Sequence, residues 1–214
     1  MGETKMSYEN PVLKTSYDFI SILDGLSDAE RKKSCISQKL NDLFTKKSFA
    51  TRLKNLDSGQ DFTKELNELL QLAQTGKRYL IHIVAHGNEN GILFGPKSID
   101  ANFIAWASIL SQLQEIHENT CGSLILNMST CKGLYGARMV PYNGKYPFFG
   151  IIGAKVSLSS IDAIKANEIM YTKWLTGTPI EKIVPETNNE LGKPIIFNLS
   201  AEGYRRLTLL NIKQ

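Results

Sequence analysis

His86 and Cys131 are the residues of this 214-residue chain whose types and surroundings suit joint chemistry. A free thiol, with a pKa of about 8.5, is mostly protonated at neutral pH, and a nearby imidazole can take that proton. Gly87 follows the histidine, and its bare backbone N–H could form an oxyanion hole together with the amide of Cys131. One such donor is worth about 2.7–4 kcal/mol in enzymes where it has been removed. The pair therefore predicts nucleophilic catalysis, with His86 as base and Cys131 as nucleophile.

An apolar run precedes each of these two residues. Residues 79–85 read Tyr-Leu-Ile-His-Ile-Val-Ala, which is typical of a strand buried on both faces, and a second such strand begins at 124–126. Sites in open α/β sheets form outside the carboxyl ends of the strands. If the two strands are parallel neighbours joined by a helix over 102–118, His86 and Cys131 meet although they are 45 positions apart (131 − 86).

The remaining elements alternate between strand-like and helix-like patterns. Ser27, with Glu30 three residues later, forms a capping box that starts a helix reaching Phe44. Further helices are expected over 62–76 and from Ser159. Strands are expected at 11–23, 49–53, 92–94, 148–153, 194–197 and 207–212. This order predicts one domain over residues 1–214, with a mainly parallel sheet of about six strands between helices.

Two segments carry a resemblance to a known group of enzymes. They read Ile-Val-Ala-His-Gly at 83–87 and Met-Ser-Thr-Cys-Lys-Gly at 128–133. At this spacing they resemble the caspase-like cysteine peptidases, which include caspases, metacaspases, separase and bacterial CHAT-domain proteases. The resemblance extends over roughly 10–212 in the order of elements, and 149–177 looks like the corresponding part of CHAT domains. Ser129-Thr130 replaces the Gln-Ala of animal caspases, which argues against that subgroup.

The resemblance implies a caspase-like α/β sandwich with helices on both faces of the sheet. It implies a thiol protease with a Cys131–His86 dyad and with the amides of Gly87 and Cys131 as oxyanion donors. The reaction would be hydrolysis of a peptide bond through a thioester, without a cofactor. A specific protein substrate, a regulatory partner protein and a role in regulated cell death or antiviral (anti-phage) defence belong to the same expectation.

Three further residues are candidates for the substrate pocket. In this protease group the segment after the 149–156 strand borders the pocket, and here Ser157-Leu-Ser-Ser160 carries no acid. A neutral or apolar residue at the cut site is therefore expected, unless the carboxylate of Asp162 faces the pocket. Arg138 would be needed instead for an acidic cut-site residue, since it is the only arginine in the loop after Cys131.

The composition of the chain argues against some classes of function. The net charge of +4, from 25 basic and 21 acidic residues, is too small to argue for nucleic acid. No apolar run approaches the roughly 18 residues of a membrane span, and residues 1–14 lack a signal-peptide pattern, so we expect no membrane contact and a cytoplasmic location. Three cysteines without metal-ligand spacing fit free thiols in a reducing compartment.

The other histidines and cysteines have structural interpretations. His82 is expected inside the sheet packing, and i, i+4 spacing on a strand separates it from His86 by about 13 Å, too far to share a metal ion. His117 is expected at a helix end, either exposed or as a favourable charge. Cys35 and Cys121 are expected to be structural.

Two other functions remain open. The same fold with an intact pair could be a catalytically silent binding or regulatory module. A flavodoxin-like or nucleotide-binding α/β module is the other alternative, although the sequence has no P-loop and no G-x-G-x-x-G motif.

Overall fold

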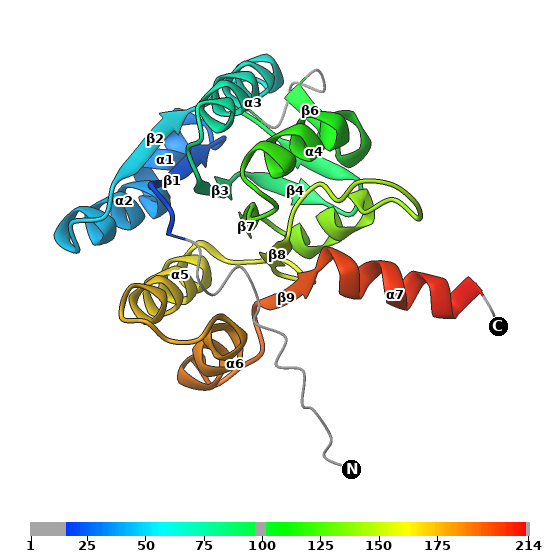
Figure 1. Ribbon diagram of the computed structural model, residues 1–214. Coiled ribbons are helices and arrows are strands. Elements are labelled where there is room, and N and C mark those ends of the chain that lie inside the picture. The colour runs from blue at the N-terminus through cyan, green and yellow to red at the C-terminus, as the bar shows by residue number, and fades with distance from the viewer. Residues whose placement is uncertain (1–15, 97–101, 213–214) are drawn as a thin grey trace, which may run out of the picture.

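A central sheet of six strands organises the molecule (Figure 1). The computed structural model describes residues 16–96 and 102–212, so the expectations for residues 1–14 and for the start of the 11–23 strand lie outside the described residues. The strand order is β2-β1-β3-β7-β8-β9, and only the β8–β9 pair is antiparallel. The strands are β1 (Phe19–Asp24), β2 (Thr51–Asn55), β3 (Tyr79–Val84), β7 (Ile125–Ser129), β8 (Gly150–Gly153) and β9 (Phe197–Ser200). The prediction of a mainly parallel sheet of about six strands is confirmed.

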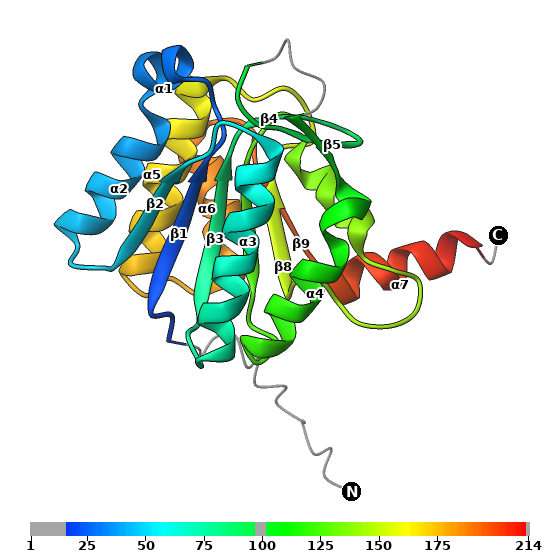
Figure 2. The same cartoon turned by 90° about the horizontal axis from the view of Figure 1, so that it is seen from above.

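Helices cover both faces of this sheet (Figure 2). One face carries α3 (Gly59–Gln74) and α4 (Leu110–Asn119), and the other carries α2 (Ile36–Lys46), α5 (Ser160–Leu175) and α6 (Ile180–Leu191). Each face has its own apolar core, because successive side chains of a strand point to opposite sides. All six residues of β3 are buried, as expected for a strand with a neighbour on either side and a core on either face.

A second, small sheet extends the carboxyl end of β3. It consists of β4 (His86–Asn88), β5 (Gly91–Leu93) and β6 (Phe103–Ala105), all antiparallel. The expected hairpin strand at 92–94 is β5. The helix expected over 102–118 begins later, because β6 and a 3₁₀ turn, η3 (Trp106–Ile109), precede α4.

The capping box predicted at Ser27 and Glu30 is confirmed, but the helix behind it is divided. α1 (Asp28–Ser34) ends at Cys35, whose φ of +53° is left-handed, and α2 then starts at Ile36. None of the residues of α1 is buried. The apolar stripe expected on one helix therefore lies on α2 alone, where Ile36, Leu40 and Phe44 are buried.

The C-terminal prediction of a strand over 207–212 is wrong. α7 (Ala201–Ile212) is a helix that extends away from the body (Figures 1 and 2). An i, i+4 ion pair between Glu202 and Arg206 supports it locally. Within the ranges that the structure describes, no helix combines the length and apolarity that a membrane crossing requires.

Candidate functional site

The carboxyl ends of β1, β3 and β7 lie side by side. Asp24 is in register with Val84, and Val84 is in register with Ser129. His86 and Cys131 each follow two residues behind this row, so both lie at the same edge of the sheet. This juxtaposition is the one that the sequence predicted from two separate strand ends.

Gly87 gives the most direct measure of how closely the two segments approach. A Cβ atom added to Gly87 would lie 2.8 Å from the carbonyl oxygen of Cys131 and 3.1 Å from Oγ1 of Thr130. Those distances are too short for any side chain, so the histidine segment and the cysteine segment are in backbone contact. The glycine is required here by that close approach rather than by its φ angle.

Cys131 lies in a tight turn directly after β7. Lys132 has a left-handed φ of +55°, and the amides of Lys132, Gly133 and Leu134 donate to Val156, Thr130 and Ala154 respectively. In the part of the chain that the structure describes, the amide of Cys131 donates to no backbone oxygen of this turn. The turn therefore presents a half-buried free thiol with its own N–H beside it.

The segment after β8 supplies the nearest polar contact of the thiol. The backbone N–H of Leu158 points at Sγ of Cys131 with a separation of 3.3 Å. Leu158 therefore contacts the thiol, and Ser157, next to it in the sequence, is exposed; the expectation that this segment borders a substrate pocket stays a prediction. Among the described residues, the side chain of Cys131 has no hydrogen bond to His86; the hydrogen bond of a catalytic pair often tightens only when substrate is bound.

His86 is instead held by an acid that sequence reasoning assigned only to helix capping. Its Nε2 lies 2.8 Å from Oε1 of Glu30, and both side chains are partly exposed. An ionised carboxylate only accepts hydrogen bonds, so Nε2 carries the proton and Nδ1 is the free nitrogen of the neutral ring. The capping motif placed Glu30 on a helix, but nothing in the sequence signals this contact across 56 positions.

A second acid at this edge is Asp24, which the sequence analysis did not single out. It is 4% exposed and accepts a hydrogen bond from the amide of Leu26. Burial raises the pKa of Asp24, against the opposing effects of Ser37, the Leu26 amide and the nearby Arg31. A buried acid that closes a strand was the available signal, because such residues are rarely left without a role in binding or packing.

The remaining pocket candidates have partners of their own. Asp162 lies 2.8 Å from Lys193, and hydrogen bonds from Lys193 and Ser159 lower the pKa of its carboxyl. Arg138 is exposed, stacks over the ring of Tyr135 and donates to the carbonyl oxygen of Glu89. The structure thus places Ser157 next to Leu158, which contacts the thiol, joins Arg138 to the tip of the β4–β5 hairpin, and pairs Asp162 with Lys193.

An ion pair ties the two halves of the site together. Nζ of Lys132, directly after the cysteine, lies 2.8 Å from Oε1 of Glu89 in the turn between β4 and β5. Hydrogen bonding to Lys132 lowers the pKa of Glu89, and the same bond raises the pKa of Lys132. Both side chains are more than a third exposed, so the pair orients the two segments more than it stabilises the fold.

The other histidines lie away from this edge. His82 is fully buried, as predicted, and its Nδ1 is hydrogen-bonded to the hydroxyl of Tyr171 at 2.8 Å. His117 is also buried, which corrects the expectation of an exposed or favourably charged residue, because burial lowers its pKa to about 4. Across residues 16–96 and 102–212, no three His, Cys, Asp or Glu side chains gather as a metal ion would need.

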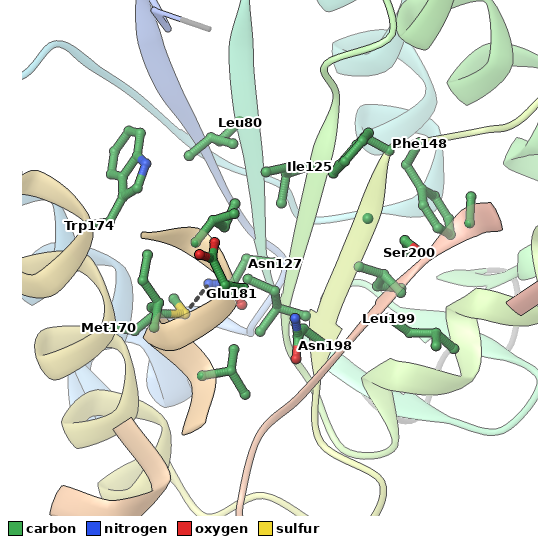
Figure 3. A pocket seen from close by; sticks show the side chains of 18 of the residues that line it. Leu80, Ile125, Asn127, Phe148, Met170, Trp174, Glu181, Asn198, Leu199 and Ser200 are labelled. Carbon is green, nitrogen blue, oxygen red and sulfur yellow. Dashed lines mark hydrogen bonds between the residues drawn. The ribbon is translucent and has the colours of Figure 1, made fainter. Parts of the chain in front are cut away.

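A cavity lies at the other end of the sheet (Figure 3). It has a volume of about 680 Å³ and lies between the sheet and helices α5 and α6, with Leu80, Ile125, Met170 and Trp174 among its walls. Asn127 supplies a polar group there and donates to the hydroxyl of Tyr171. Neither His86 nor Cys131 lines this cavity, so the cavity is separate from the edge of the sheet that carries these two residues.

No protein-family model matches this sequence, and a search of curated proteins finds no match. Any assignment of function therefore depends on the geometry of the site.

Proposed function

We propose that this chain is a caspase-like cysteine endopeptidase in which Cys131 is the nucleophile and His86 the base. The observation that carries the proposal is the contact of Gly87 with the carbonyl of Cys131, which joins the ends of two parallel strands. Covalent acyl transfer requires at least a nucleophile and a base, and here a free, half-buried thiol and a histidine lie at one edge of the sheet.

The chemistry follows from this placement. His86 takes the proton of the Cys131 thiol, and the sulfur attacks the carbonyl carbon of a peptide bond. The amides of Gly87 and Cys131 are the candidate donors to the oxygen that becomes negative. His86 then gives its proton to the leaving amine, which leaves a thioester on Cys131. A water molecule, deprotonated by His86, hydrolyses that thioester and regenerates the thiol.

The substrate is proposed to be a specific protein, cut after a neutral or apolar residue. Residues 157–160 next to the thiol contain no acid, and the carboxylate of Asp162 is engaged by Lys193. A regulatory partner protein, a cytoplasmic location and a role in regulated cell death or antiviral defence rest on the resemblance to bacterial CHAT-domain proteases alone.

The decisive experiment is covalent labelling with a panel of peptidyl acyloxymethyl ketones, read by intact mass. We expect one label per chain, at Cys131, whose formation is abolished by Cys131→Ala and slowed at least about a hundredfold by His86→Ala. Cys121→Ala is the matched control, since Cys121 is an exposed free thiol elsewhere. Labelling that is equal at Cys121 and Cys131, or that ignores His86, would refute the dyad.

The second candidate function is a binding module, and the cavity of about 680 Å³ favours it. Its walls are mainly apolar, with Asn127 as an oriented polar group, which is the usual character of a small-molecule site. A titration with 1-anilinonaphthalene-8-sulfonate, an amphiphilic anion whose aromatic rings bind apolar sites, tests this through quenching of tryptophan fluorescence, because Trp174 lines the cavity. Saturable quenching that Val184→Phe abolishes would favour binding, since Val184 is buried on α6 and lines the cavity.

A further inference from the structure

The two carboxylate oxygens of Glu30 contact different partners. Oε2 accepts hydrogen bonds from the backbone N–H of Ser27 at 3.2 Å and from its hydroxyl at 2.7 Å. Oε1 takes the contact with Nε2 of His86. The capping box fixes the carboxylate to the first turn of α1, so its second oxygen reaches the histidine from a defined direction rather than from a free surface chain.

The carboxylate of Glu30 stays ionised down to low pH. Burial raises the pKa of Glu30, but hydrogen bonds from Ser27 and His86 outweigh burial and lower the pKa to about 2. Glu30 is therefore an anion wherever a cysteine peptidase would operate. An anion beside one ring nitrogen holds the imidazole in one tautomer and compensates the imidazolium that forms on taking the thiol proton.

The position of Glu30 depends on α1, which is attached by polar contacts. Arg31, one residue on, has a side chain only 11% exposed. Its guanidinium donates to Asp28 on α1, to Asp57 before α3, and to the backbone oxygen of Asp24 at the end of β1. This fork docks α1 onto the edge of the sheet where His86 and Cys131 lie.

We propose that Glu30 is the positioning residue of His86, completing a Cys131–His86–Glu30 relay that is assembled when α1 docks through Arg31. The proposal rests on the function proposed above. Glu30 holds Nε2–H, which leaves Nδ1 to take the proton from the thiol of Cys131, and no proton passes to the carboxylate itself. α1 thereby becomes the element through which a regulatory partner would switch the site.

The other charged groups near His86 at this edge of the sheet have partners of their own. Asp57 is ion-paired with Arg31 and Glu89 with Lys132, while the carboxylate of Asp24 accepts from the amide of Leu26 with Arg31 nearby. The groups that bear on the pH dependence of the relay are thus Glu30 from α1, Cys131 from the turn after β7, and these two neighbouring ion-pair sets.

Glu30→Gln is the sharpest test, because glutamine also serves at this position of a capping box and keeps the shape of the side chain. We expect the rate of Cys131 labelling to fall at least about tenfold, less than the roughly 10⁴-fold loss at a fully buried triad aspartate, since Glu30 is partly exposed. The labelling profile from pH 5 to 9 should also change shape, with the loss greatest at the acidic side. Glu30→Asp should restore part of the rate.

Glu186→Gln is the matched control, since Glu186 also pairs with a cation at the surface, Lys173 at 3.1 Å. It should leave both the rate and its pH profile unchanged. An unchanged profile in Glu30→Gln would overturn the proposal. Faster labelling in Glu30→Gln would also overturn it, because Glu30 would then be restraining the histidine rather than positioning it.

Alkylation by iodoacetamide, which needs no peptide pocket, separates failure of this proposal from failure of the proposed peptidase. It is measured at Cys131 in a Cys35→Ala, Cys121→Ala background. Dependence of that rate on both His86 and Glu30, without any peptidyl labelling, would refute the peptidase and retain the relay. Dependence on His86 alone would retain the dyad and refute the relay, and dependence on neither would refute both.

Discussion

At the scale of single residues, the site depends on how little space separates two backbone segments. Gly87 and Cys131 come from different strands, yet an added Cβ on Gly87 would lie 2.8 Å from a backbone oxygen. Backbone atoms cannot rotate away as the end of a flexible side chain can. The separation of the histidine and cysteine segments is therefore set by the absence of a side chain at one position.

Gly87→Ala should accordingly damage the site. Since the methyl group must displace the Cys131 turn, we expect labelling of Cys131 to slow at least about tenfold and stability to fall by about 1–3 kcal/mol, as overpacking usually costs. Gly150→Ala is the control, because its added Cβ would lie 3.6 Å from the carbonyl oxygen of Leu199, an ordinary contact. Urea denaturation and labelling rates, measured on both variants, check this. Equal behaviour of the two would contradict the close approach.

The sequence predicts some residues of the site and not others. His86 and Cys131 are predictable, because each follows an apolar run and parallel strands bring their carboxyl ends together. Glu30 is predictable only as a cap, since its contact with His86 depends on the direction in which α1 leaves β1. The pocket assignments of Asp162, Ser157 and Arg138 remain predictions, and the pairing of Asp162 with Lys193 arises from the packing of α5 and α6.

At the scale of elements, α1 is the part of the site most open to control. It buries none of its residues, so its docking depends on directional polar contacts and not on an apolar face. Arg31 makes two of those contacts with one planar group, to Asp57 and to the backbone oxygen of Asp24. Helices held in this way release more readily than helices that are packed on a core.

Arg31→Lys should therefore loosen α1 while preserving charge. A lysine ammonium cannot reproduce the fork of a guanidinium, so we expect faster hydrogen exchange at the amides of residues 31–35 and a severalfold loss of labelling at Cys131. Arg206→Lys, which alters an exposed ion pair with Glu202 on α7, is the control. It should change neither the hydrogen-exchange rates nor the rate of labelling at Cys131. Unchanged exchange in Arg31→Lys would show that α1 is held by something other than the fork.

The sequence predicts helices and strands correctly where a whole segment is buried, and wrongly where neighbouring residues favour different structures. The strand β3 was readable because all its side chains are buried. α6 was not foreseen, since Pro185 lies inside it, where proline removes one hydrogen bond of the helix. Residues 207–212 are apolar enough to suggest a strand, but within residues 16–96 and 102–212 no strand pairs with them, and the i, i+4 ion pair at the start of α7 favours a helix.

At the scale of the whole molecule, the sheet separates two regions with different properties. Its carboxyl edge carries the thiol, the histidine and four of the ion pairs, whereas the cavity beneath α5 and α6 is mainly apolar. A titration that affects the interior can therefore change global stability without acting first at the site. The buried histidines on the two faces of the sheet provide such a titration.

His82 and His117 should make the fold sensitive to mild acid. Burial lowers the pKa of His82 to about 3 and that of His117 to about 4, from an ordinary 6.5. Between those values and pH 6.5 the unfolded chain binds more protons than the native one, so stability is full above pH 6.5 and is lost as the pH falls. One pH unit below 6.5 should cost about 1.4 kcal/mol for each histidine.

Urea denaturation at pH 7.5 and pH 5.5 measures this loss, in a range above the ordinary titration of carboxyl groups. The native chain should lose about 3 kcal/mol between the two conditions. His82→Gln, whose side-chain amide can still hydrogen-bond to Tyr171, should lose only about half as much, and His117→Gln likewise. Both variants start from a lower stability, so the pH difference within each variant is the quantity compared. A difference that neither substitution reduces would mean that these histidines become protonated in the folded chain, and that the acid sensitivity arises elsewhere.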